Sequence, residues 1–235
     1  MDAAGVAAGW RVLDTGTGPG TVASLAAARG AQVTAVDAEP SMLEMARRRV
    51  PAADVRHGVL PDLPFPAGYF DGVVANFVIN HVGDPAAAVA ELCRVIRPGG
   101  RVAVTIWPHP QPPMQRLLLD AFESSGAQRP PSVPQVAADK NFARTPDGLF
   151  GLLRQAGFGE VHCSTINWVH RIDPDDWWAG PAGGPGSLGV LMKDQPPAVV
   201  DRIRSEYDQL AAGYRGADGM LALPTAALLA SAAVP

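Results

Sequence analysis

The sequence is poor in cysteine and in long apolar runs, and each shortage excludes a class of protein. Its 235 residues contain two cysteines, Cys93 and Cys163, which lie far apart and in no CxxC pattern. A zinc site or a disulfide framework is therefore not expected, and we expect two small buried side chains. No stretch approaches the roughly 20 apolar residues of a membrane-spanning helix, and no secretory signal is visible. These absences predict a cytoplasmic protein.

Positive charge is also scarce. The chain has 19 Lys and Arg against 23 Asp and Glu, a net charge of −4. Nucleic-acid-binding proteins usually carry a basic face, so a nucleic-acid partner is not expected. The one basic run, Arg47-Arg48-Arg49, is interpreted as the solvated end of a helix.

Apolar patterning predicts an alternation of strands and helices. Strands are expected over 11–15, 31–36, 70–79, 101–107 and 161–169, and helices over 21–29, from Ser41, and over 84–96, 145–157 and 197–213. Ser41 and Glu44 have the spacing of a capping box. Strands that alternate with helices of this length form βαβ units. The sequence therefore predicts an α/β fold with a parallel sheet and helices on both faces.

Three segments are less regular. Residues 108–140 are rich in proline without a sustained period, which favours a loop region or a lid. Residues 180–189 are rich in glycine and proline and predict a connector. The end, 225–234, fits a strand or a short helix. Because there is no repeat and no second core, we expect a single domain over 1–235 with a helical insertion.

A glycine-rich turn follows the first predicted strand. Gly16, Gly18 and Gly20 give the pattern GxGxG. Glycines there let the backbone turn sharply and approach a ligand, and the following helix start favours negative charge. A dinucleotide site would have GxGxxG, but position 21 is Thr. A nicotinamide-dependent oxidoreductase is therefore only a third hypothesis.

Asp37 stands at the end of the second predicted strand. Its carboxylate accepts hydrogen bonds only, and at this position it could accept from both hydroxyls of a ribose. The alternative is a helix-capping or loop aspartate.

Five motifs in order resemble those of class I SAM-dependent methyltransferases that act on small molecules. They are Val12–Gly20; Val36-Asp37; Asp62–Pro66 with Tyr69–Asp71; Asn80–Val82 with Asp84-Pro85; and Glu91–Gly100. The resemblance covers residues 10–107, which would form the cofactor-binding core. It implies a Rossmann-like, mostly parallel seven-stranded sheet with helices on both faces and a helical or loop insertion near the C-terminus.

The resemblance also implies a cofactor, S-adenosyl-L-methionine (SAM), with S-adenosylhomocysteine as product and no metal. Asp14 and the turn would hold the methionine end, and Asp37 the ribose. The other implied cofactor-binding positions are the turn residues Gly16, Thr17, Gly18 and Gly20; Ala38 and Met42 on the adenine side; Val59 and Leu60 at the adenine edge; and Asn76 facing the methionine moiety.

Candidates for catalysis and substrate binding follow the fourth and fifth strands. His81 is at the family's histidine position and could act as a base, or it could orient its loop. Trp107 and His109 lie where side chains meet the cleft, although a tryptophan that anchors a lid and an exposed loop histidine are the alternatives. The segments 108–140 and 170–220 are expected to shape the pocket for a small-molecule acceptor.

Two departures from the family keep a second hypothesis open. Val59 stands where relatives usually have an aspartate that binds the adenine amino group, and only residues 1–10 precede the first strand, where relatives have helices over the cofactor. The alternative is thus a degenerate methyltransferase-fold protein that serves as a binding module. Neither nucleic acid nor membrane is expected as a partner, and a homodimer is left open.

Overall fold

The computed structural model describes residues 1–128, 140–183, 192 and 195–235. The chain divides into two compact units. The first comprises Met1–Pro108, Val136–Ile166 and Ala227–Pro235, and the second comprises His109–Gln135 and Asn167–Ala226. The single domain expected over 1–235 stays a prediction.

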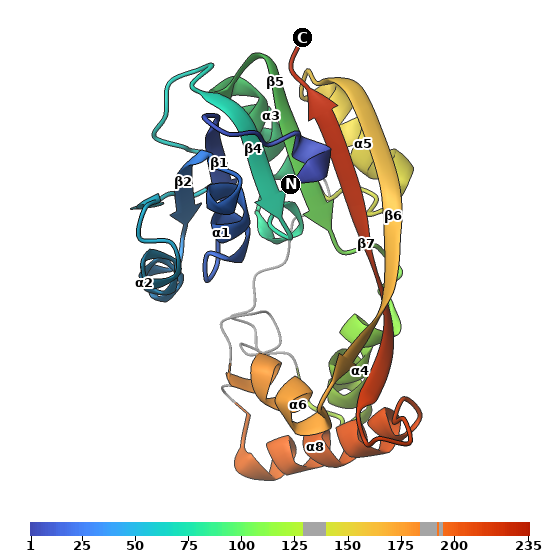
Figure 1. The fold of residues 1–235 in the computed structure, drawn as a ribbon. Helices are drawn as coiled ribbons and strands as arrows, with labels where there is room; N and C mark the ends of the chain where they lie inside the picture. The colour runs from blue at the N-terminus through green and yellow to red at the C-terminus, as the bar shows by residue number, and fades with distance from the viewer. Residues whose placement is uncertain (129–139, 184–191, 193–194) are drawn as a thin grey trace. The chain divides into compact units, whose positions relative to one another are not determined.

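A seven-stranded sheet in the order β3-β2-β1-β4-β5-β7-β6 organises the first unit (Figure 1). Its strands β1 to β5 pair in parallel, and β7 runs antiparallel to β5. This confirms the predicted mostly parallel, seven-stranded Rossmann-like sheet. The strands are β1 Arg11–Thr15, β2 Gln32–Asp37, β3 Asp54–His57, β4 Phe70–Asn76, β5 Ile96–Ile106, β6 Gly159–Ile172 and β7 Leu221–Ala233.

Two apolar layers cover the two faces of this sheet, because neighbouring residues of a strand point to opposite sides. Val12 belongs to one buried cluster and Leu13 to the other, and Val74 and Val73 of β4 divide in the same way. Figure 1 shows α1 on one face and α3 and α5 on the other. The helices of this unit are α1 Thr21–Ala28, α2 Pro40–Arg49, α3 Pro85–Val95 and α5 Pro146–Gln155, with short 3₁₀ helices η1 Asp2–Ala4 and η2 Ile79–His81. Both cysteines are free and pack, partly buried, against the larger cluster.

The capping box predicted for α2 is not formed. The helix begins at Pro40 with Glu39 as N-cap, and the Ser41 hydroxyl donates to Glu39 Oε1 at 3.2 Å. The prediction was wrong because proline at the first helical position has its φ already fixed for a helix and starts it earlier. By contrast, the expected cap at Asp84 is confirmed, since its Oδ1 accepts from the Ala87 N–H at 3.0 Å.

The strands also differ from the predictions: β5 begins at Ile96 rather than at 101, one strand ends earlier and one was not predicted. β4 ends at Asn76 rather than at Ile79, because Phe77 adopts a left-handed φ of 58° and η2 follows. β3 was missed, since its four residues at the edge of the sheet are mostly exposed and carry no apolar run.

The second unit contains the helices α4 Pro113–Ser124, α6 Pro174–Gly183 and α8 Pro197–Ala212. The interpretation of 108–140 as loop is wrong for 113–124, where five side chains of α4 are buried and the helix packs on α8. The buried Tyr207 of α8 donates its hydroxyl to the carbonyl of Pro174 at 2.6 Å. Of the predicted connector, 184–189 lie outside the described residues. The open choice at 225–234 is decided in favour of strand β7.

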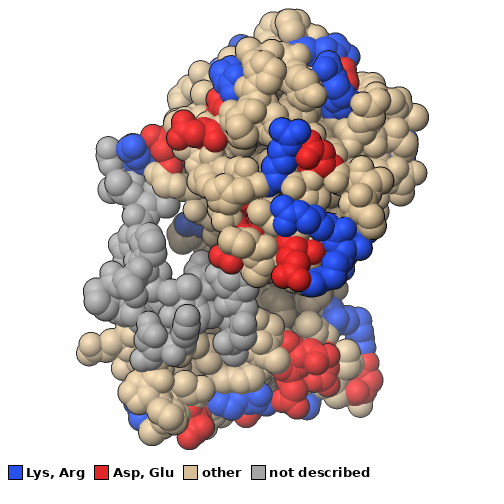
Figure 2. Space-filling model, turned by 90° about the vertical axis from the view of Figure 1, so that its left-hand side faces the viewer, with Lys and Arg blue, Asp and Glu red and all other residues tan. Residues whose placement is uncertain are grey.

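The arginine run lies in the last turn of α2 and is exposed, as predicted. Arg48 pairs with Glu44 at 2.6 Å, and nearby on β3 Arg56 pairs with Asp54 at 2.5 Å. Figure 2 shows basic and acidic side chains intermixed on the face it presents. This mixture fits a solvated surface better than a site for a polyanion.

The buried face of β4 provides a test of the core. Phe70 is 0% exposed, whereas Phe150 on α5 is 44% exposed. We expect Phe70→Ala to lower the free energy of unfolding by about 3–5 kcal/mol, because it leaves a cavity, and the matched Phe150→Ala to lower it by roughly 1 kcal/mol or less. Urea denaturation measures both, and equal losses would contradict the assignment of Phe70 to the core.

Candidate functional site

A cavity of about 290 Å³ lies at the carboxyl ends of β1 and β2. This is the end of a parallel sheet at which α/β proteins bind ligands. Six of the residues predicted from the sequence line it: Gly16, Asp37, Ala38, Val59, Leu60 and His81. Five lining residues were not predicted: Thr15, Gly58, Val78, Val82 and Gly83.

The glycine-rich turn begins at this cavity, which Thr15 and Gly16 line. Gly16 has φ +62° and a Cβ there would lie 2.3 Å from Val78 Cγ2, so a larger residue would clash with the neighbouring loop. Gly18 has φ +54°, and no described atom lies within 4 Å of the place a Cβ would take. The backbone at Gly18 is therefore open to the approach of a ligand.

Asp14 lies buried beneath the turn, 1% exposed. Its Oδ2 accepts from the Thr17 hydroxyl at 2.6 Å, while its buried Oδ1 has no hydrogen-bond partner in the described parts of the chain. Burial is the largest effect and raises the pKa of Asp14 to about 7. The hydrogen bonds from Thr17 and from the Ala23 backbone lower this pKa by less. An unpaired buried acceptor of this kind costs free energy unless a ligand donates to it.

Asp37 links the second strand to the turn. Its Oδ2 accepts from the Gly18 N–H at 2.8 Å and its Oδ1 from the Glu39 N–H at 2.9 Å. These contacts fix the carboxylate at the cavity wall. Each oxygen keeps a lone pair, so the group can still accept from ligand hydroxyls.

Asn76 ends β4 and is oriented by a residue that the sequence did not reveal. Thr105 on the neighbouring β5 donates its hydroxyl to Asn76 Oδ1 at 2.6 Å. The backbone N–H of Phe77 donates to the carbonyl oxygen of Thr105 at 2.9 Å and to the Oγ1 of Thr105 at 3.1 Å. This leaves the Asn76 Nδ2 as the part of the amide that can face a ligand. The parallel pairing of Asn76 with Thr105 is a tertiary feature, so no local sequence signal identifies Thr105.

His81 ends η2 at the edge of the cavity. Its Nε2 lies 3.2 Å from Nδ2 of Asn80, whose own Oδ1 is buried without a partner among the described residues. The surrounding protein removes water from the ring and lowers the pKa of His81, and the positive charge of Arg144 lowers it further. The ring is therefore neutral at neutral pH and has one nitrogen, Nδ1, away from Asn80.

Phe77 and Trp107 form an aromatic pair at the ends of β4 and β5. Their rings stack with centroids 3.8 Å apart and planes 14° apart. Phe77 holds its ring from a left-handed backbone, a conformation that costs a bulky residue about 1–2 kcal/mol. Strain of this kind often marks functional positions.

The remaining predicted residues fall into two groups. Thr17 and Gly20 belong to the turn, and Met42 lies in the first turn of α2, partly buried. His109 belongs to the second unit and is not among the residues that line this cavity.

The residues present fit SAM. The buried Asp14 Oδ1 is an acceptor that an ammonium group would satisfy, the backbone at Gly18 is open, and Asp37 can accept from ribose hydroxyls. Ala38, Val59 and Leu60 offer apolar surface for a flat ring. Among the described residues, no group of three or more His, Cys, Asp or Glu could hold a metal ion.

Comparison with known proteins agrees with this geometry. A family model described as a methyltransferase domain matches residues 13–104. The chain is 35% identical over 169 residues to a demethylmenaquinone methyltransferase of Clavibacter sepedonicus, covering 66% of this chain and 67% of that one. It is 30% identical over 188 residues to the enzyme of the same name from Paenarthrobacter aurescens, covering 75% and 74%.

Among solved structures, the YcgJ protein of Bacillus subtilis superposes with a TM-score of 0.64 at 21% identity, covering 99% of this chain and 95% of that one. At this identity the likeness supports the fold alone. The sequence matches go further, and they show that the chain belongs to the class I SAM-dependent methyltransferase family.

Proposed function

We propose that this chain binds SAM in the cavity at the carboxyl ends of β1 and β2 and transfers its methyl group to a small, flat acceptor beside Phe77 and Trp107. The observation that carries the proposal is the lining of that cavity. Residues of separate sequence motifs meet there: Gly16 of the turn, Asp37 and His81.

Within this proposal the residues of the cavity and of the strand ends beside it have separate roles. Asp14 would accept from the ammonium group of the methionine end through its unpaired Oδ1, and the Asn76 amide would lie beside the same moiety. Asp37 would accept from the ribose, with Ala38 and Val59 against the adenine. When bound, the sulfonium of SAM supplies an activated methyl group, so the protein's task is to hold a nucleophile in line with it.

The acceptor that we propose is a hydroquinone-like aromatic ring. Two relatives are named for demethylmenaquinone. A methyl cation equivalent needs an electron-rich partner, so the reduced, phenolic form of such a ring would be the nucleophile. The stacked pair of Phe77 and Trp107 offers a flat apolar surface of the kind that aromatic ligands prefer.

His81 would act as the base that removes a phenolic proton. Because its Nε2 contacts Asn80, the free Nδ1 is the atom that would take the proton. For this, His81 carries its proton on Nε2 and donates it to the oxygen of the Asn80 amide. The amide group of Asn80 is then rotated by 180° from the orientation described above, which exchanges its oxygen and nitrogen. Asn80 would then hold the ring while it becomes charged.

Location and assembly are also proposals. No helix in the described ranges is long and apolar enough to cross a membrane. We propose that the chain works in the cytoplasm on a small molecule rather than on nucleic acid. A homodimer stays a prediction that light scattering would test.

Asp37→Ala should weaken the binding of S-adenosylhomocysteine by about 10- to 100-fold, because hydrogen bonds to a charged group are each worth about 1.5–3 kcal/mol. Calorimetric titration of the folded proteins measures this effect. Asp62→Ala, which removes a neighbouring carboxylate outside the cavity lining, serves as control and should bind like the wild type. No detectable binding to the folded wild-type chain would instead favour the non-catalytic alternative.

Asp14 should make stability depend on pH. Its pKa is 3.8 when unfolded and about 7 when folded, so the folded state binds more protons between these values. Stability therefore falls as pH rises from about 4 to about 7, by roughly 2–4 kcal/mol from this group. Asp14→Asn should remove that slope in urea titrations across the range. An unchanged slope would show that Asp14 ionises normally in the folded chain.

His81→Gln should lower kcat for a demethylmenaquinol analogue by about 10²- to 10⁴-fold, the usual contribution of a general base, and leave S-adenosylhomocysteine binding unchanged. In the wild type, activity should rise with pH through the pKa of His81, below its ordinary value of 6.5, since only the neutral ring accepts a proton. Retention of this acidic limb in His81→Gln would assign the base to another group.

A further inference from the structure

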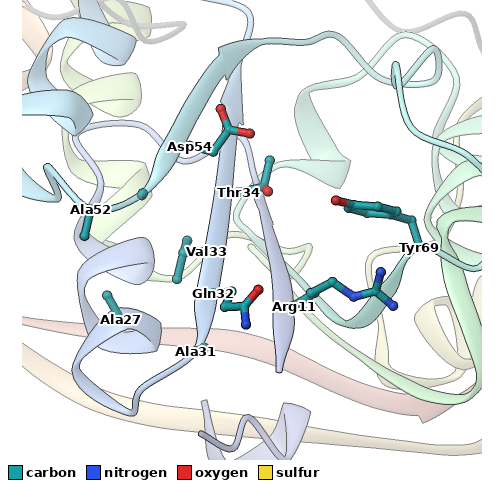
Figure 3. Close-up of a pocket in the computed structure, with 10 residues that line it drawn as sticks. Arg11, Ala27, Ala31, Gln32, Val33, Thr34, Ala52, Asp54 and Tyr69 are labelled. Carbon is teal, nitrogen blue, oxygen red and sulfur yellow. The ribbon is translucent and has the colours of Figure 1, made fainter. Parts of the chain in front are cut away.

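A second cavity, of about 370 Å³, lies at the opposite ends of the same strands (Figure 3). Arg11 opens β1, Gln32 opens β2 and Asp54 opens β3, so this cavity is at the amino ends of the strands. Thr34 and Tyr69 also line it, and alanines near the end of α1 and before β3 complete the wall. None of the residues assigned to methyl transfer contributes to it.

The polar residues of this cavity share one face of the sheet. Arg11 pairs with Gln32 and Thr34 pairs with Asp54 in the parallel register, and directly paired residues point to the same side. The connection from β3 to β4 contains no helix, so beside β2 and β3 a loop covers this face, which packs against α3 further along the sheet. That loop brings Tyr69 over it, and Figure 3 shows the Tyr69 hydroxyl pointing toward Thr34.

These side chains retain unused hydrogen-bonding capacity. The side chains of Gln32 and Thr34, the hydroxyl of Tyr69 and the terminal nitrogens of Arg11 make no hydrogen bond within the described parts of the chain. The hydroxyl of Tyr207, by comparison, is bound to a carbonyl. Several polar groups without protein partners that converge on one hollow are typical of a ligand site.

Two charged residues line the cavity, Arg11 and Asp54, and the ion pairs they make with residues outside the lining leave Arg11 the less engaged of the two. Three guanidinium groups, of Arg11, Arg56 and Arg97, face two carboxylates. The carboxylate of Asp54 forms an ion pair with Arg56 at 2.5 Å, and that of Asp71 forms one with Arg97 at 2.7 Å. Arg11 Nε is left with a distant contact of 3.8 Å to Asp71.

Arg11 is nevertheless held in place. Its guanidinium lies over the Tyr69 ring, 4.7 Å from the centroid, and its backbone N–H donates to Asp71 Oδ2 at 2.7 Å. A guanidinium fixed by stacking, with its terminal N–H groups unbonded, suits a planar or tetrahedral oxyanion.

We propose that this cavity binds the oxyanion group of a small hydroxylated molecule, with Arg11 on the anion and Thr34, Gln32 and Tyr69 on the hydroxyls. The site is independent of the proposed methyl transfer, since it shares no residue with the SAM cavity. A phosphate ester and a sugar acid present the same chemistry to it.

The test is a titration of the full chain, followed by amide NMR, with glycerol 3-phosphate and gluconate as probes and glycerol as the uncharged control. We expect saturable shifts around Thr34 and Tyr69 with at least one anionic probe and none with glycerol. The anion that binds more tightly identifies the phosphate or the carboxylate as the preferred group.

Arg11→Gln should weaken that binding by at least about tenfold, the effect of losing charge-assisted hydrogen bonds. Arg29→Gln is the matched control, because Arg29 is also partly exposed and pairs with Asp2 away from the cavity. Should Arg11→Gln unfold, Thr34→Val removes a hydroxyl without a change of charge and should weaken the same probe. The dispersion of the amide NMR spectrum checks that each variant keeps its fold.

Three results would overturn the proposal: no saturable shift with either anion, equal binding of glycerol, or equal weakening in Arg29→Gln. Each can be obtained whether or not the chain transfers methyl groups, because no activity is measured. Failure of this site and failure of the methyltransferase proposal are therefore distinguishable.

Discussion

The parallel pairing of β1 with β2 and β4 is the constraint on which both cavities of the first unit depend. Thr15 pairs with Val36 on one side and with Ala75 on the other. The next residues along the chain, Gly16, Asp37 and Asn76, therefore emerge at the same edge of the sheet. An antiparallel neighbour would have sent one of these groups to the far end.

That shared edge allows one short contact to organise the cofactor side. The Gly18 N–H donates to Asp37 Oδ2 at 2.8 Å, which ties the turn after β1 to the end of β2. The turn can take this path because Gly16 and Gly18 adopt positive φ. Beneath it, Asp14 is buried with one oxygen unpaired, which is unfavourable for the isolated chain and suits a positively charged ligand group. The site is thus partly destabilised in a way that binding would relieve.

The opposite edge has a different character. In the cavity proposed for SAM, backbone groups and one aspartate meet apolar side chains, whereas at the amino ends Arg11, Gln32 and Thr34 lie beside a loop that covers this part of the sheet. The short, helix-free connection between β3 and β4 accounts for this difference. The same loop places Phe65 in the core and Tyr69 over Arg11, so one segment completes the core on one side and frames a polar hollow on the other.

The sequence by itself determined the fold class and most of the residues proposed here for SAM binding. The apolar alternation, the GxGxG turn and Asp37 are local signals. The family resemblance added Ala38, Val59, Leu60 and His81, and these four line one cavity with Gly16 and Asp37. Local signals failed where a neighbour decided the outcome. Pro40 displaced the expected cap at Ser41. In α4 the buried residues from Met114 to Phe122 recur at helical spacing, a short period that the surrounding prolines obscured.

Only the tertiary structure decided which groups act together. Thr105 holds Asn76, Asn80 contacts His81, Phe77 stacks on Trp107, and Arg11 lies over Tyr69. Three of these pairs join residues more than 25 positions apart, as the sheet register and the loop paths dictate. The fourth joins sequence neighbours whose contact depends on the turn that η2 makes. Sequence records which chemical groups are present, but the distance between two side chains is a property of the packed chain.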